Sequence, residues 1–198
     1  MECLKLKAGE IHQWGTPLLN RLSHEVFVTE TDTVLGISGS FRHQDMCDKI
    51  NNIKGRGHTN LILLISQFEQ LEEICDASQY KFILEKYWPG AMTFNLHKRN
   101  HHDTVAVRLP NNPFLLELIS KIGPLWSTSA NRHLETPAQT VEQAIKIFGR
   151  EISLYIEGGS QNRTLVPSTL VDLCGKPRVI RQGKGEFTNP LGTEKSIG

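Results

Sequence analysis

The 198-residue sequence lacks most of the features that mark membrane, secreted or fibrous proteins. Its four cysteines are far apart and form no CxxC pair, so neither a zinc site nor a disulfide framework is expected at Cys3, Cys47, Cys75 or Cys174. The longest aliphatic run, residues 61–65, is far shorter than the roughly 20 apolar residues of a membrane helix. The N-terminal residues lack the apolar stretch of a secretory signal, so we expect a cytoplasmic protein with free thiols.

Charge of one sign and the common nucleotide-binding motifs are also missing. The formal net charge is +1, so any nucleic-acid or phosphate site must be a local cluster of basic residues. The absence of GxxxxGK[ST] disfavours a P-loop nucleotidase, and GxGxxG and GxSxG are absent as well. His97, His101, His102 and Asp103 lie in one polar connection without the spacing of metal ligands, so no metal site is assigned to them.

The remaining composition is that of an ordinary globular domain, with 38% hydrophobic and 22% charged residues. Helices and strands interleave, which predicts one α/β domain with a mixed sheet over residues 1–187 and a flexible tail over residues 188–198. The periodicity predicts strands at residues 24–29, 61–66, 92–97, 104–109, 125–127, 153–157, 168–173 and 178–181. It predicts helices at residues 44–53, 67–75, 80–87, 113–121 and 140–148, the last capped by Thr140 with Gln143 three positions on.

Several polar segments follow these predicted elements. The turn TETDTVLG (29–36) follows the first predicted strand and would place donors at the edge where open α/β sheets bind ligands. A solvated turn is the alternative for this segment. The segment STSAN (127–131) offers successive donors for an anion or, alternatively, the cap of a turn. A hydroxyl pair in PST (167–169) opens another strand, and Arg181 ends the last one.

Basic residues stand at two further positions where a ligand could bind. Lys54 and Arg56 end a predicted helix before a glycine-containing loop, and they could clamp phosphates or simply complement the helix dipole. Arg108 ends an apolar strand and therefore needs an anionic partner. That partner is either Asp103 or Glu117 within the chain, or the carboxylate or phosphate of a ligand.

Taken in order, eight segments resemble the YrdC-like family, the threonylcarbamoyl-AMP synthases. They are TDTVLG (31–36), KGR (54–56), WPGAMT (88–93), VAVRLP (105–110), STSAN (127–131), EGG (157–159), PSTLVD (167–172) and IRQG (180–183). Each motif is weak alone, but this order and spacing over nearly the whole chain is hard to obtain by chance. The sequence departs from the family pattern at Glu30, Leu35, Gly57, Ala91 and Gln182, on the loops expected to close over substrate.

The resemblance implies a single-domain twisted mixed sheet flanked by helices, with a basic concave face. It implies formation of L-threonylcarbamoyl-adenylate from L-threonine, bicarbonate or CO2, and ATP, with release of pyrophosphate and with Mg2+ assisting. The product would pass to a tRNA threonylcarbamoyl transferase for the threonylcarbamoyladenosine modification of tRNA. Direct contact with tRNA or another RNA is a further possibility under this resemblance.

The resemblance also implies roles for individual residues. Lys54, Arg56 and Arg108 would stabilise the reacting anions, and no covalent nucleophile is expected. The threonine site would comprise Thr31, Thr33, Arg108, Thr128 and Ser168. The ATP site would comprise Lys54, Arg56, His58, Ser129, Asn131, Thr140 and Arg181.

Two other functions stay open at this point. A YrdC-like module that binds RNA is one, because residues 160–198 carry more basic than acidic side chains; a strongly salt-dependent RNA affinity without ATP turnover would distinguish it. A paralogue acting on a different carbamoyl- or acyl-adenylate substrate is the other, and the loop departures permit it.

Overall fold

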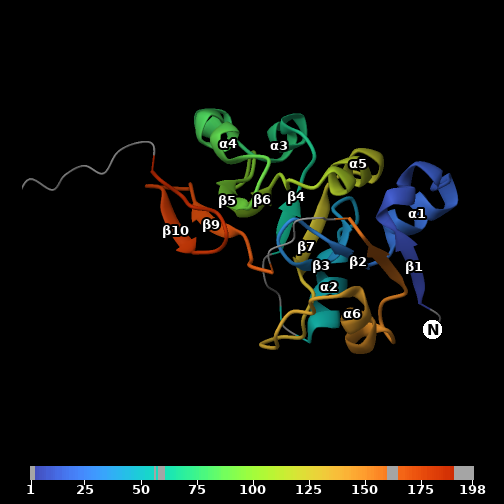
Figure 1. The fold of residues 1–198 in the computed structure, drawn as a ribbon. Coiled ribbons are helices and arrows are strands. Elements are labelled where there is room, and N and C mark those ends of the chain that lie inside the picture. The colour runs from blue at the N-terminus through green and yellow to red at the C-terminus, as the bar shows by residue number, and fades with distance from the viewer. Residues whose placement is uncertain (1–2, 56, 58–60, 160–164, 190–198) are drawn as a thin grey trace, which may run out of the picture.

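The computed structural model describes residues 3–55, 57, 61–159 and 165–189. Within these residues one ten-stranded sheet runs in the order β1-β8-β2-β3-β7-β4-β6-β5-β9-β10 (Figure 1). The strands are β1 (Leu4–Lys7), β2 (Phe27–Glu30), β3 (Leu35–Ser40), β4 (Ile62–Leu64), β5 (Met92–His97), β6 (Thr104–Arg108), β7 (Leu125–Ser129), β8 (Leu154–Glu157), β9 (Thr169–Asp172) and β10 (Arg178–Arg181). The helices are η1 (Ala8–Gln13), α1 (Thr16–His24), α2 (Met46–Lys54), α3 (Phe68–Ile74), η2 (Ser78–Tyr80), α4 (Lys81–Tyr87), α5 (Pro113–Ile122) and α6 (Val141–Phe148).

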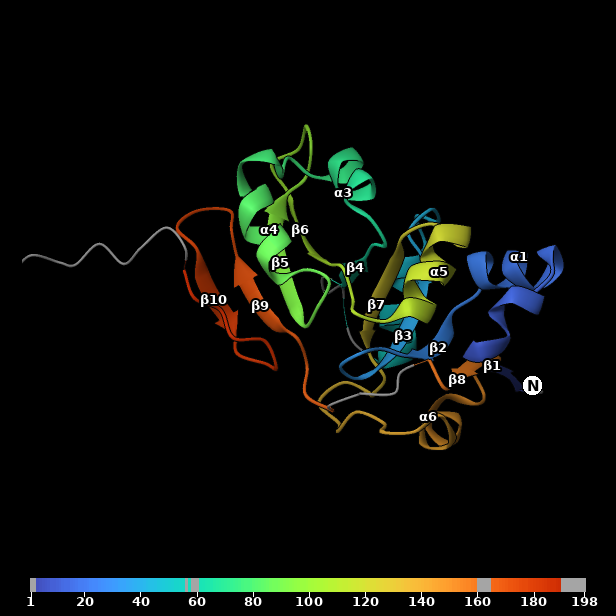
Figure 2. The ribbon, with the colours of Figure 1, turned by 45° about the horizontal axis from the view of Figure 1, so that its top comes forward.

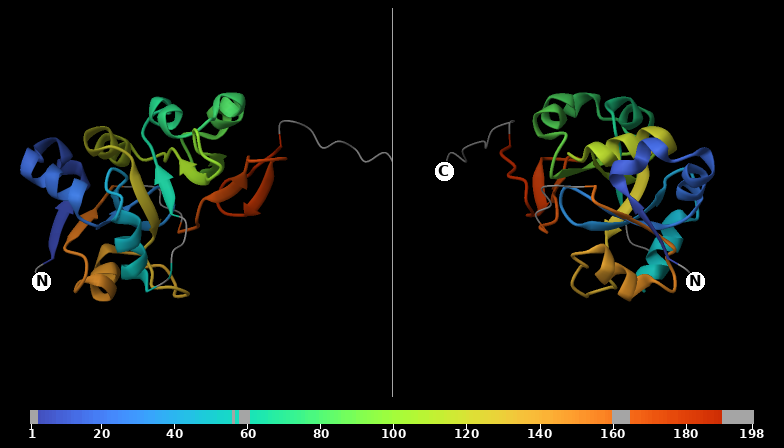
Figure 3. Two further views of the ribbon diagram at one scale, coloured as in Figure 1. Left: turned by 180° about the vertical axis from the view of Figure 1, so that it is seen from behind. Right: turned by 45° about the vertical axis from the view of Figure 1, so that its right-hand side comes forward.

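The sheet mixes parallel and antiparallel pairs, as the sequence predicts. β2 and β3 form an antiparallel hairpin, and β3 pairs with β7 in the same sense. β4 pairs with β6, and β5 with β9, in parallel. β1 forms one edge and the β9–β10 hairpin lies at the other end of the molecule, as two further views show (Figure 3). None of the described helices is long and apolar enough to span a membrane.

Most predicted elements are confirmed, and three differences stand out. The strand predicted at residues 24–29 begins only at Phe27, because His24 ends α1. No strand was predicted after the turn at residues 29–36, but Leu35–Ser40 forms the fully buried strand β3. The N-terminal elements β1, η1 and α1 were not predicted. Thr140 does cap α6, since its hydroxyl accepts from the Gln143 N–H at 3.2 Å.

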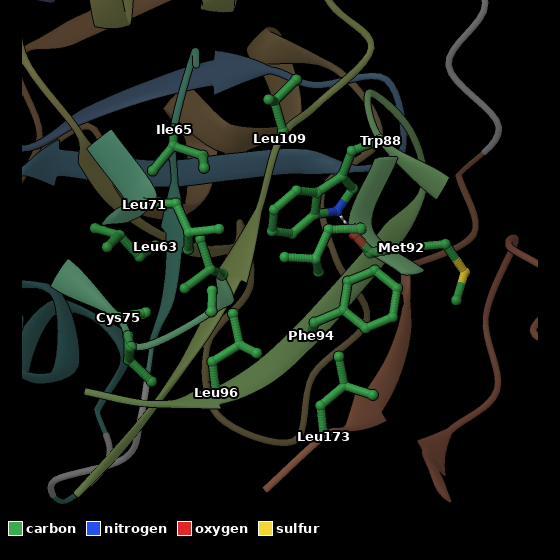
Figure 4. Close-up of a cluster of buried hydrophobic side chains, with 14 of the residues drawn as sticks. Leu63, Ile65, Leu71, Cys75, Trp88, Met92, Phe94, Leu96, Leu109 and Leu173 are labelled. Carbon is green, nitrogen blue, oxygen red and sulfur yellow. Dashed lines mark hydrogen bonds between the residues drawn. The ribbon is translucent and has the colours of Figure 1, made fainter. Parts of the chain in front are cut away.

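Three hydrophobic clusters hold the helices to the sheet. The first packs α3 and α4 against β4, β5, β6 and β9, with Trp88 and Phe94 at its centre (Figure 4). The Trp88 indole N–H donates to the Met92 carbonyl at 2.7 Å, which satisfies its polar atom inside this cluster. The second cluster packs α2 and α6 against β2, β3 and β8, and the third packs η1, α1 and α5 around Phe27 and Leu125. Figure 2 shows β9 and β10 at the end of the sheet opposite β1 and β8.

Candidate active site

A pocket of about 240 Å³, here called the small pocket, lies where the β2–β3 turn meets β4, β7 and the end of β6. Its described lining residues are Thr31, Thr33, Val34, Gly36, Ile62, Leu64, Arg108, Ser127, Thr128, Ser129, Pro137, Pro167, Ser168 and Arg181. The structure therefore brings together every residue predicted at the threonine site. From the predicted ATP site it adds Ser129 and Arg181.

Arg108 is the most enclosed charge in this wall, with only 4% of its side chain exposed. Its Nη2 donates to Asp32 Oδ1 at 2.5 Å, its Nη1 to the Thr33 hydroxyl at 2.7 Å and its Nε to the Gly90 carbonyl at 2.9 Å. The ionic partner is thus Asp32, from the β2–β3 turn. It is neither Asp103 nor Glu117, which pair with surface lysines instead.

The environment of Arg108 leaves it charged and able to hold a ligand. Burial lowers the pKa of the Arg108 guanidinium, and the negative charge of Asp32 acts in the opposite direction. Because the pKa of an arginine is so high, the group stays protonated at any physiological pH. Three of its N–H groups contact described protein atoms, and a guanidinium has five. The remaining N–H groups are the donors available to an anion in the small pocket.

The turn that supplies Asp32 is held by the Thr31 hydroxyl. This oxygen accepts from the Thr33 N–H at 3.0 Å and the Val34 N–H at 3.1 Å, and it donates to the Val34 carbonyl at 2.7 Å. Thr33 Oγ1 lies 3.0 Å from the same hydroxyl and also accepts from Arg108. The hydroxyl-rich turn therefore shapes the wall of the pocket and orients the arginine, in the manner of turns closed by Ser or Thr side chains.

A second cation, Arg181, also lines the small pocket. Its Nη2 donates to the Ser168 carbonyl at 2.9 Å, and the Ser168 hydroxyl lies 2.7 Å from that of Thr93. Partial desolvation of its guanidinium lowers the pKa of Arg181, although the residue as a whole is exposed. Two arginines and no carboxylate line the described part of the small pocket, so its electrostatics favour an anion.

Residues that sequence reasoning missed form the floor of the small pocket. A Cβ on Gly36 would lie 3.0 Å from the Ser127 hydroxyl, so the close approach of β3 to β7 favours glycine there. Ile62 and Leu64 project from β4 and give the floor an apolar part. The alternation of β4 is a signal that could have placed them on one face, but nothing local indicates that this face lines a pocket.

Lys54 holds the backbone next to the small pocket without being one of its lining residues. The residue is 1% exposed, and its ammonium donates to the Ser129 carbonyl at 2.6 Å, the Asn131 carbonyl at 2.7 Å and Asn131 Oδ1 at 3.0 Å. Asn131 Oδ1 also accepts from the Ser129 hydroxyl at 2.6 Å, while its amide donates to the Arg132 and Glu135 carbonyls. Neither Lys54 nor Asn131 is a lining residue of the small pocket. Both fix the segment 129–131, where β7 ends and the next loop begins, here called the Ser129 loop.

The other predicted ATP contacts are not in this wall. Thr140 is exposed and serves as the cap of α6. Arg56 and His58 lie outside the described residues. Of the departures from the family pattern, Leu35 is buried in the second cluster, and the Gln182 amide donates to the Gly183 and Gly185 carbonyls.

A larger pocket of about 700 Å³, here called the large pocket, lies beside the β2–β3 turn. Asp32, Gly90 and Asn111 belong to its wall, together with η1, the start of α5, Gly158–Gly159 and Lys184. Ala91, another departure, lines it as well. Of these two pockets, Asp32 lines the large one and its partner Arg108 lines the small one. The ion pair therefore forms part of the partition between the two.

Comparison with known families agrees with this geometry. The family model Sua5_yciO_yrdC, described as telomere recombination, matches residues 22–183. The chain belongs to the Sua5/YciO/YrdC family. This confirms the predicted family, and the mixed sheet with flanking helices is the fold of its solved members.

Relatives within the family differ in length. Threonylcarbamoyl-AMP synthase of Vibrio vulnificus is 30% identical over 176 residues, covering 80% of this chain and 92% of the relative. The protein of the same name from Pyrococcus abyssi is 30% identical over 167 residues, covering 78% of this chain and 49% of the relative. The chain thus spans about half the length of the P. abyssi relative and most of the V. vulnificus one.

Two solved structures illustrate the likeness. The crystal structure of P. abyssi Sua5 complexed with L-threonine superposes with a TM-score of 0.80 at 25% identity, covering 92% of this chain and 58% of that one. Escherichia coli YciO superposes with a TM-score of 0.78 at 22% identity, covering 94% and 98%. At that lower identity the YciO likeness concerns the fold alone.

Proposed function

We propose that the chain forms L-threonylcarbamoyl-AMP from L-threonine, bicarbonate or CO2, and ATP, and releases pyrophosphate. The observation that carries this proposal is the small pocket, in which two arginines and a set of hydroxyls converge with no carboxylate in the described lining. Its volume of about 240 Å³ suits an amino acid, since pockets for drug-sized ligands measure roughly 300–1,000 Å³. The names of the relatives and the threonine complex of the P. abyssi protein support the same reaction.

The chemistry asks for positioning and charge neutralisation. The amine of threonine adds to CO2 to give a carbamate, whose oxygen attacks the α-phosphorus of ATP while pyrophosphate leaves. The carbamate is already an anion, so the step needs neither a covalent nucleophile nor a strong base. Reactions of this kind are accelerated by holding the two anions in line and balancing their charge, which is what fixed arginines can do.

We assign the threonine subsite to the Arg108 side of the small pocket. The free N–H groups of Arg108 would hold the carboxylate, because arginine pairs with carboxylates through two parallel hydrogen bonds. The Ser168 hydroxyl would contact the substrate hydroxyl, and Thr31, Thr33 and Thr128 would complete the polar wall. Ile62 and Leu64 would accept the methyl group, since they supply the apolar floor.

We assign the triphosphate to the Arg181 side. Ser129 also lines the small pocket, and Arg56 and His58 remain predicted contacts. Lys54, Asn131 and Thr140 would act on ATP only indirectly, through the Ser129 loop and the start of α6. Among the described residues no cluster of three or more His, Cys, Asp or Glu is placed to hold a metal. Mg2+ would enter as MgATP, because in nucleotide sites this ion is held largely by the substrate phosphates.

The product would have to leave for an acceptor. A mixed anhydride of a carbamate and AMP is reactive toward water, so we propose transfer to a tRNA threonylcarbamoyl transferase. The proposed role of the chain is then the first step of threonylcarbamoyladenosine formation in tRNA.

Pyrophosphate release by the purified protein tests the proposal. We expect release from ATP only when threonine and bicarbonate are both present. An Arg56→Ala protein purified in parallel controls for a contaminating host enzyme, and it should lose roughly 1.5–3 kcal/mol of transition-state stabilisation. Release that does not depend on threonine would contradict the synthase and favour the paralogue with another substrate. RNA binding that weakens steeply with salt, without any turnover, would favour the RNA-binding module.

A further inference from the structure

Asp32 is a buried carboxylate that has no role in the reaction proposed above. Its Oδ1 accepts from Arg108 Nη2 at 2.5 Å, and its Oδ2 accepts from the Asn111 N–H at 3.1 Å. The side chain is 11% exposed, and it lines the large pocket but not the small one. Asp32 therefore stands behind Arg108 as seen from the small pocket.

The contacts of Arg108 show why this carboxylate decides how the guanidinium points. The Gly90 carbonyl and the Thr33 hydroxyl are neutral acceptors, and only Asp32 supplies an opposite charge. A buried guanidinium without a counter-charge turns toward water or toward any other anion within reach. With Asp32 in place, Nη2 of the guanidinium is held by a residue of the large-pocket wall, while Arg108 itself lines the small pocket.

We propose that Asp32 is a positioning residue that sets selectivity for the amino-acid carboxylate by fixing Arg108. This inference rests on the proposed function, because it takes the substrate carboxylate to bind Arg108. Asp32 itself does not touch the substrate. The Asp32 charge also offsets the positive charge of Arg108. Arg108 then binds a carboxylate through oriented hydrogen bonds and attracts a polyphosphate less strongly at long range.

The affinities for the two ligands should therefore respond differently when the charge of Asp32 is removed. Asp32→Asn keeps the shape of the side chain but removes the charge that holds the Arg108 guanidinium. The guanidinium donors are then no longer oriented toward the threonine carboxylate. The same change makes the site more positive, which leaves ATP binding unchanged or strengthens it. General damage to the fold would lower the affinities for threonine and ATP together. A loss of threonine affinity alone therefore distinguishes positioning from a merely structural role.

Calorimetric titration of threonine and of ATP into wild type and Asp32→Asn measures this split. We expect the threonine Kd to rise at least about tenfold, the usual effect of a lost charge-assisted contact, and the ATP Kd to stay within about twofold or fall. Asp172→Asn is the matched control, because Asp172 pairs with Arg178 at 3.3 Å, is 15% exposed and lines neither pocket. It should change neither Kd by more than about twofold.

A double variant tests whether Asp32 acts through Arg108. In an Arg108→Lys background the fork is already gone, so adding Asp32→Asn should change the threonine Kd by less than about twofold. Full additivity of the two substitutions would overturn the inference. An unchanged threonine Kd in the single Asp32→Asn variant, or a parallel loss of both ligands, would overturn it as well.

Two further measurements keep the inference separate from the proposed function. If wild type binds no threonine, the proposed function fails, and solvent exchange of the Arg108 Nε–H in NMR spectra still decides the positioning role. That exchange should be at least about tenfold faster in Asp32→Asn, and an unchanged rate would contradict a fixed guanidinium. If Asp32→Asn does not fold, Asp32→Glu keeps the charge but moves it by one methylene. Asp32→Glu should raise the threonine Kd and leave the ATP Kd unchanged. A variant whose two Kd values both equal those of wild type would count against the proposal.

Discussion

Lys54 and Arg108 are both buried cations beside the small pocket, and the structure uses them differently. The Lys54 ammonium is directed at two carbonyls and an amide oxygen of the Ser129–Asn131 segment. The Arg108 guanidinium has one carboxylate and two neutral partners. An ammonium has three N–H groups and a guanidinium five, so the same number of protein contacts saturates the lysine and leaves the arginine with donors to spare.

This difference indicates which cation can meet a ligand. Lys54 stabilises the position of the Ser129 loop and so acts on the pocket through the backbone. Arg108 lines the pocket itself and keeps part of its fork open. A charged residue in a family motif can thus either hold the backbone around a pocket or line the pocket itself. The number of its N–H groups that make no contact within the protein distinguishes the two roles.

The largest expected effect is on stability and comes from Lys54→Met. The substitution removes an ammonium donor from three oxygens, of which Asn131 Oδ1 and the Ser129 carbonyl each keep one other donor. We expect a loss of about 2–4 kcal/mol in the free energy of unfolding, measured by urea titration. Lys49→Met on the same helix removes only an exposed pair with Asp45 and should leave stability unchanged. A fully stable Lys54→Met protein that no longer binds ATP would instead make Lys54 a ligand contact.

A somewhat smaller effect is expected when serine replaces threonine as substrate. Serine lacks the methyl group that we place on Ile62 and Leu64, so it should be used less well by about 1–3 kcal/mol in kcat/KM. Valine leaves the polar wall unpaired and should be rejected more strongly.

Ile62→Ala should reduce the difference in kcat/KM between threonine and serine, because the shorter side chain no longer packs against the methyl group of threonine. Ile180→Ala on the exposed face of β10 is the control and should leave the difference unchanged. An Ile62→Ala enzyme with wild-type selectivity would move the methyl subsite away from β4.

The smallest expected effect is on stability and comes from Thr140→Ala, which tests whether Thr140 caps a helix or contacts ATP. The resemblance placed Thr140 at ATP, whereas the structure makes it the cap of α6. Thr140→Ala should lower the free energy of unfolding by about 1 kcal/mol and leave the ATP Kd unchanged. A fivefold or larger loss of ATP affinity at unchanged stability would restore the predicted contact.

The fold could be predicted where local patterning and burial agree. β5 and β10 were predicted with the ends that the structure gives them, because apolar or β-branched residues and clear turn signals bound them. β3 was missed because LGISGS has little strand propensity. Gly39 serves packing instead: a Cβ there would come within 2.3 Å of Met46 Sδ, so the Met46 side chain of α2 would have to move.

The site could be predicted as a set of residues but not as a network. The motifs identified Arg108, Ser168 and Arg181, which the structure gathers in one pocket. The partner of Arg108 was sought at Asp103 and Glu117, close in the chain, and the residue that pairs with it, Asp32, lies 76 positions away. Whether a lysine such as Lys54 points into a pocket or into its frame depends on packing that no local pattern encodes.

The central claim is that Arg108 is the threonine-binding cation, and Arg108→Lys tests it most directly. Lysine keeps the charge but loses the planar fork, so threonine affinity should fall by about 10–150-fold while the ATP Kd changes by less than about twofold. Both constants can be measured by calorimetric titration of the wild-type and variant proteins. A variant whose ATP Kd rises while its threonine Kd stays at the wild-type value would contradict the claim and place Arg108 in the phosphate site.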